Sequence, residues 1–104
     1  MKLIIITAVK EFEKDVKQIL KKSNIFLFSY QEIIGYRNTP REANLNNWFP
    51  GERHENESIM FYTFVKSEDT VTLFKQINEF NDKQETSSKV HLAILKVEKS
   101  NYNL

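Results

Sequence analysis

The chain has 104 residues, the size of one domain, and its formal net charge of +1 gives no overall attraction to nucleic acid or anionic lipid. The lack of cysteine excludes a disulfide framework, a cysteine-based zinc site and thiol catalysis, and it fits a cytoplasmic protein. No apolar run approaches the roughly 20 residues that cross a bilayer, so we expect no membrane insertion.

Apolar periodicity divides the chain into four strands and two helices. Apolar and β-branched runs without helical spacing predict strands, whereas apolar residues three or four positions apart predict amphipathic helices. The first run is short for a signal peptide and has no small-residue cleavage site, so we interpret it as a buried strand. The predicted elements, in chain order, are strand 2–9, helix 11–22, strand 25–36, strand 58–66, helix 70–81 and strand 90–97.

This β-α-β-β-α-β order predicts the ferredoxin-like fold, an α+β arrangement in which a four-stranded antiparallel sheet carries two helices on one face. We expect a single domain over residues 1–104, with a long loop, 36–57, between the second and third strands. In the second helix, apolar residues near one face predict the buried stripe, namely Val71, Phe74, Ile77 and Phe80.

The second and third predicted strands are apolar on both faces, although two helices can cover only one face of the sheet. Large exposed apolar patches are uncommon on soluble monomers, so we predict a homo-oligomer in which other copies cover the open face. Without a partner, some members of a set of four aromatic side chains should project from that face: Phe28, Tyr30, Phe61 and Phe64.

The long loop is the place where we expect function, since loops of this length in a small domain are usually functional or disordered. It contains both prolines of the chain and its only tryptophan. Trp48 and Phe49 stand in the stretch "NNWFPGE", and two interpretations stay open. The pair either folds back to cap a cleft or forms a contact patch for a partner, because aromatic residues often anchor interfaces.

A second stretch of the loop, "GERHENE", offers ligands for a divalent metal. Glu52, His54 and Glu55 supply carboxylates and an imidazole, with Glu57 close behind. A solvated charged loop explains the same composition, and we favour that interpretation over a metal site because the histidine spacing matches no metal motif. The other histidine, His91, lies between apolar residues and is expected to be a satisfied sheet residue.

Three short stretches resemble the P-II signal-transduction family. Lys10-Glu11-Phe12 is similar to the turn after that family's first strand, and "EIIGY", residues 32–36, is similar to the base of its long T-loop. Lys89-Val90 resembles the end of its phosphate-binding B-loop. The stretch before it, Glu85–Lys89, contains no glycine, whereas the family's loop is glycine-rich.

The resemblance implies a non-enzymatic homotrimer with an effector site in the cleft between subunits. Gly35, Arg37 and Lys89 would be its ligand-binding residues, because two cations and a close backbone approach suit an anion such as an adenine nucleotide. Trp48 and Phe49 would contact a larger protein, a membrane transporter being the implied partner. Surface charges in weak ion pairs are the alternative interpretation of the cations.

The last strand, "LAILKVEKSNY", is also similar to that of the CutA family, trimeric ferredoxin-like proteins linked to divalent-metal tolerance. That resemblance implies an alternative, a metal-binding protein with ligands from His54 and the adjoining glutamates. We expect no enzyme, since no catalytic motif or paired carboxylate is evident, although a dimeric ferredoxin-like enzyme is a third, weaker hypothesis. The pattern of an RNA-recognition module is missing from "SIMFYTFV".

Overall fold

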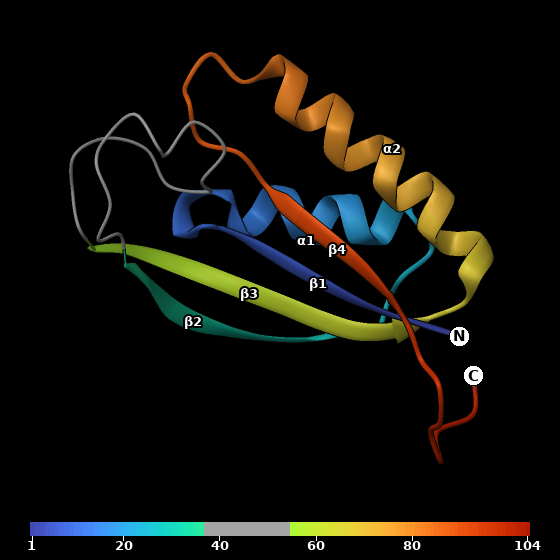
Figure 1. Ribbon diagram of the computed structural model, residues 1–104. Helices are drawn as coiled ribbons and strands as arrows, with labels where there is room; N and C mark the ends of the chain where they lie inside the picture. The colour runs from blue at the N-terminus through green and yellow to red at the C-terminus, as the bar shows by residue number, and fades with distance from the viewer. Residues whose placement is uncertain (37–54) are drawn as a thin grey trace.

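The computed structural model describes residues 1–36 and 55–104, which form a four-stranded antiparallel sheet with two helices on one face (Figure 1). The strand order β2-β3-β1-β4 is that of the ferredoxin-like fold, so the predicted α+β architecture is confirmed. The elements are β1 (Lys2–Val9), the 3-10 turn η1 (Lys10–Phe12), α1 (Glu13–Lys22), β2 (Ser29–Tyr36), β3 (Glu55–Val65), α2 (Ser67–Lys83) and β4 (His91–Lys96).

The core lies between the helices and the helix-facing side of the two central strands. Alternate residues of a strand point to the same face, so Ile4 and Ile6 of β1 face the helices together. Ile6 is paired with Phe61 of β3, and both are fully buried. The helices contribute the other half of this cluster, chiefly Val16, Ile19 and Leu20 from α1 and Leu73 and Ile77 from α2.

The second strand begins at Ser29, four residues later than the sequence predicted, because the end of α1 continues into a Schellman motif. Asn24 has a φ of 65°, a left-handed conformation that asparagine tolerates better than most residues. The N–H of Ile25 donates to the carbonyl of Leu20 at 2.9 Å, and both side chains are buried. Ile25 therefore completes the helix end instead of starting a strand.

The third strand begins at Glu55, earlier than predicted, and its first residues pair only with β2. The register runs from Tyr36 opposite Glu55 to Ser29 opposite Tyr62. Glutamate and asparagine are poor strand formers, so the sequence pattern at residues 55–57 gave no signal. A neighbouring strand supplies hydrogen-bond partners that override that weak preference.

The buried face of α2 differs from the prediction by a rotation of about one residue. Thr70, Leu73 and Ile77 are buried, whereas Val71 and Phe74 are 72% and 53% exposed. Leucine at position 73 takes the core position that the pattern assigned to Phe74. Of the predicted stripe, Ile77 is fully in the core, and Phe80 packs edge-on against Phe12 with ring centroids 5.1 Å apart.

The opposite face of the sheet, here called the open sheet face, carries apolar side chains that neither α1 nor α2 covers. Its members alternate with core residues along three strands: Leu3 and Ile5 of β1, Met60, Tyr62 and Phe64 of β3, and Leu95 of β4. Tyr62, Phe64 and Leu95 are 40%, 37% and 42% exposed. The predicted two-sided apolar character of the third strand is therefore confirmed.

Of the four aromatic residues, some of which were predicted to project from the open sheet face, Phe64 is the one that lies there. Phe61 is fully buried among the helices, and the ring of Tyr30 lies 5.5 Å from it. The ammonium of Lys17, on α1, lies 4.2 Å from the centre of the Tyr30 ring, which fixes that ring on the helix side. Phe28 packs against the same core.

The orientation of α2 on the sheet can be tested by measuring the stability of variants at two of its residues, Leu73 and Val71. Leu73→Ala removes a fully buried side chain and should lower the free energy of unfolding by about 3 kcal/mol. The matched control Val71→Ala changes an exposed side chain and should alter it by less than about 0.5 kcal/mol. Urea denaturation measures both, and similar losses from the two variants would contradict the observed helix phase.

Candidate functional site

The end of the sheet from which residues 37–54 depart is here called the loop end. Tyr36 at the end of β2 is paired with Glu55 at the start of β3, so the segment leaves and re-enters the sheet on neighbouring strands. His91, the first residue of β4, is opposite Thr7 near the end of β1, so the α2–β4 connection arrives at the same end. The strand ends that flank residues 37–54 and the last connection of the fold thus lie at the same end of the sheet.

Two of the three predicted ligand-binding residues can be located, and they lie at opposite edges of the sheet. Gly35 is in β2, the edge strand on one side, and Lys89 precedes β4, the edge strand on the other. Three strand spacings separate these edges, which amounts to about 14 Å. One chain alone therefore does not bring Gly35 and Lys89 into a single small site.

The connection that carries Lys89 is fastened to α2 by the side chain of Asn81. Its amide oxygen accepts from the N–H of Val90 at 2.8 Å, and its amide nitrogen donates to the carbonyl of Val90 at 2.9 Å. Lys89 donates from Nζ to the carbonyl of Asn81 at 3.4 Å, near the negative end of the helix dipole. Asn81 thus orders this glycine-free connection, a role that the sequence analysis missed.

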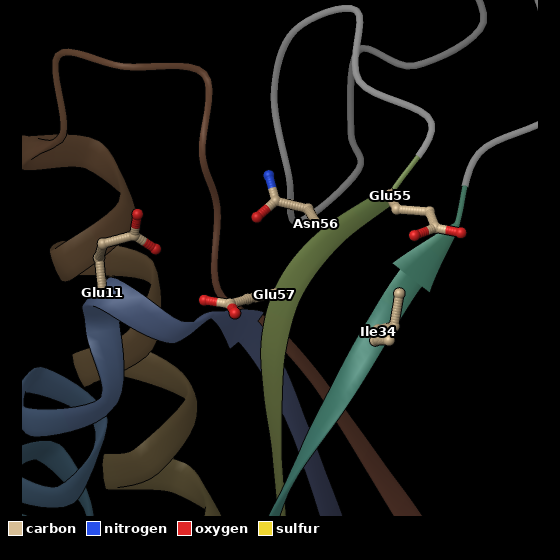
Figure 2. A pocket seen from close by; sticks show the side chains of 5 residues that line it. All are labelled: Glu11, Ile34, Glu55, Asn56 and Glu57. Atoms are coloured by element: carbon tan, nitrogen blue, oxygen red, sulfur yellow. The ribbon is translucent and has the colours of Figure 1, made fainter.

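The same end of the sheet contains a hollow of about 630 Å³ whose lining includes three glutamates. Its described lining residues are Glu11 of η1, Ile34 of β2, and Glu55, Asn56 and Glu57 of β3 (Figure 2). In Figure 2 the carboxylate of Glu57 points toward Glu11, and that of Glu55 points away from both. Negative charge makes the hollow unsuitable for a phosphate group.

Of the predicted metal ligands, Glu55 and the neighbouring candidate Glu57 are among the described residues, and both line this hollow. Across residues 1–36 and 55–104, no three His, Asp or Glu side chains lie close enough together to hold a metal ion. A metal site at the hollow would therefore need further ligands. Glu52 and His54, the other predicted metal ligands, lie outside the described residues, as do Arg37, Trp48 and Phe49.

Among the described residues, the ammonium of Lys10 is close enough to one of these carboxylates, that of Glu57, to interact with it. Its Nζ donates to Oε1 of Glu32 at 3.1 Å, and this ion pair links η1 to β2. This hydrogen bond, and then the negative charge of Glu32, raises the pKa of Lys10 above its ordinary value. Glu57 and Glu13 act in the same direction with smaller effects.

Comparison with models of known protein families gives no match, and comparison with curated proteins gives none either. Neither the P-II-like nor the CutA-like resemblance is therefore supported by sequence matching, and both stay predictions. Among the described residues, no helix has the length and apolar character needed to cross a bilayer.

The ion pair between Lys10 and Glu32 has a testable pH dependence. The pKa of Lys10 is raised in the folded state. The stabilisation of the fold by the ion pair is therefore fully present below the pKa of lysine in the unfolded chain, about 10.4, and is lost as the pH rises through the pKa of Lys10 in the folded chain. Glu32→Gln should lower the pKa of Lys10, measured by NMR titration of the side chain. Lys17, whose pKa is raised by Glu13, is the internal control. An unchanged Lys10 pKa would show that the pair does not form in solution.

Proposed function

We propose that this chain is a non-enzymatic P-II-like regulatory protein that works as a ring of identical copies. It binds a small anionic effector between neighbouring subunits and signals to a larger partner protein through residues 37–54. The proposal rests on the ferredoxin-like fold, on the position of the loop end, and on the separation of the predicted ligand-binding residues.

The separation of Gly35 and Lys89 is the observation that carries this proposal. These residues lie at the same end of the sheet but on its two opposite edges, β2 and β4. In the ring that we propose, the β2 edge of one chain would lie next to the β4 edge of its neighbour, a head-to-tail contact of the kind that closes into rings. Ring assembly would therefore unite the two halves of a site that one chain keeps about 14 Å apart.

The open sheet face supplies the second support. Six apolar residues line it without a covering element in the described part of the chain, and burial against other copies would remove their surface from water. The expected count of three copies comes from the family resemblance and not from this face.

The effector in this proposal is an adenine nucleotide or a similar anion. Lys89 and the neighbouring chain's Arg37 would supply two positive charges, and Gly35 of β2, which is buried in the single chain, would let a ligand approach the backbone closely once it was uncovered, because it has no β-carbon. The carboxylates of Glu11 and Glu57, which line the acidic hollow, would repel the phosphate groups and so keep them close to the cations.

Signalling in this proposal depends on residues 37–54 as the element whose pose the effector biases. The segment follows Tyr36 of β2 and precedes Glu55 of β3, which are paired. Because Gly35 directly precedes Tyr36, a ligand at the β2 edge would contact the chain close to the start of the segment. Trp48 and Phe49 would face the partner, a membrane transporter being the proposed class.

A thermal-shift experiment tests effector binding. ATP, ADP or AMP at 100 times its dissociation constant should stabilise the protein by about 2.7 kcal/mol, because only the folded assembly binds it. Lys89→Ala and Arg37→Ala should each abolish the shift, read against each variant's own ligand-free midpoint. Lys75→Ala, an exposed lysine on α2, is the control and should keep it. If no nucleotide stabilises the wild-type chain, the nucleotide proposal fails.

A second candidate function is a CutA-like or efflux-associated divalent-metal-binding protein, and the observation that favours it is that Glu55 and Glu57 line one hollow with Glu11, although these three carboxylates do not by themselves form a metal-binding group. Glu55 directly follows His54 in the chain, Glu57 comes two residues after Glu55, and Glu11 lines the same hollow. Residues His54 and Glu52 would add the imidazole and the further carboxylate that Zn²⁺ or Cu²⁺ sites commonly use.

Metal titration by calorimetry separates this candidate from the first. In the metal-binding case, Zn²⁺ or Cu²⁺ should bind the wild-type chain, and His54→Ala should weaken binding at least tenfold because an imidazole ligand is lost. His91→Gln, which changes the other histidine of the chain, should leave binding unchanged. Equal affinities for wild type and His54→Ala would exclude His54 as a ligand.

A further inference from the structure

Residues 98–104, here called the tail, follow β4 and turn to the side of the sheet away from α1 and α2 (Figure 1). There the ring of Tyr102 lies 5.9 Å from the ring of Phe64, with 36° between their planes. Phe64 belongs to the open sheet face, and the part of that face around it is here called the Phe64 corner. The tail of each chain therefore already occupies one corner of an apolar surface that neither helix covers.

The contact of the tail with this corner is incomplete. Tyr102 borders a shallow hollow of about 230 Å³ whose apolar lining comes from the segment before β2 and from β3, namely Leu27, Phe28, Tyr62 and Phe64. Interiors of proteins leave few spaces of this kind, since atoms that face a gap lose their dispersion contacts on that side. The tail is therefore packed more loosely than the core.

On its other side the tail meets a surface of mixed polarity. A second hollow, of about 260 Å³, is lined by Tyr102 and Leu104 of the tail and by polar residues that include Asn24, Lys66 and Asp69. Exposed fractions of 43% for Tyr102 and 52% for Leu104 show that neither side chain is sealed against the sheet.

Few interactions hold the tail in this pose. The backbone N–H of Tyr102 donates to Oγ of Ser100 at 3.0 Å, which is a bond within the tail itself. Across residues 1–36 and 55–104, no hydrogen bond or ion pair joins the tail to the other described residues. A contact between two aromatic rings shifts an equilibrium by about two- to tenfold, and the entropy of ordering the tail opposes it. A competing surface can therefore displace the tail.

We propose that the tail is an autoinhibitory strap: Tyr102 covers the Phe64 corner in the single chain and leaves it when another copy of the chain takes its place. This inference rests on the proposed ring, because that ring buries the open sheet face. A second copy offers more apolar area than one tyrosine ring, and burial of apolar area drives association. The strap thus sets the chain concentration above which copies assemble.

Sedimentation equilibrium tests the strap through the sign of one effect. Tyr102→Ser removes the covering ring and should lower the concentration at which half of the chains are assembled at least twofold. Phe74→Ser is the matched control, because it removes a ring of similar exposure from α2, 53% against 43%, and it should leave this concentration unchanged. Loss of an exposed aromatic ring ordinarily weakens self-association, so stronger assembly is the result that distinguishes release of a strap.

NMR spectroscopy follows the pose of the tail directly. Nuclear Overhauser contacts between the rings of Tyr102 and Phe64 should be present at concentrations where the wild-type chain is a monomer, and they should vanish as it assembles. A monomer without these contacts, or an assembly that keeps them, overturns the strap.

The outcomes separate the strap from the ring. If the wild-type and Tyr102→Ser chains both stay monomeric at all concentrations, the ring and the strap are overturned together. A wild-type ring that Tyr102→Ser weakens or leaves unchanged overturns the strap alone and leaves the proposed function standing.

Discussion

The pairing of β1 with β3 is the contact on which the rest of the molecule depends. These two strands form the centre of the sheet, and each carries apolar side chains on both faces. Ile4 and Ile6 point to the helices, and Leu3 and Ile5 point the other way. Two helices of this length cover one face only, so the register that builds the core also creates the open sheet face.

The pattern of the sequence was sufficient for the order and type of the elements, because alternation and helical spacing survive in each of them. It failed where a local motif or a competing residue decided the outcome. Asn24 and Ile25 close α1 in a Schellman motif, which removed the first residues of the predicted second strand. On α2, two orientations of the helix would each turn apolar residues toward the core. Packing against the sheet buries Leu73 and leaves Phe74 exposed, and the spacing of apolar residues does not determine which of the two orientations forms.

The candidate site was harder to predict because its geometry depends on the order of strands in space. Sequence resemblance suggested that Gly35 and Lys89 act together, but only the order β2-β3-β1-β4 reveals that they lie on opposite edges. The double hydrogen bond of Asn81 with Val90 had no sequence signal, since an asparagine near a helix end has many roles. The acidic hollow combines Glu11 with Glu57, which lie far apart in the chain.

The joining of residues 37–54 to the paired positions Tyr36 and Glu55 has an evolutionary consequence. Since the strands already hold the two ends together, the cost of the connecting segment grows only with the logarithm of its length, about 0.6 kcal/mol for each doubling. Insertions, deletions and exchanges of sequence there leave the core residues untouched. A chain with this fold can therefore change the length and sequence of this segment while the residues that build its core stay the same.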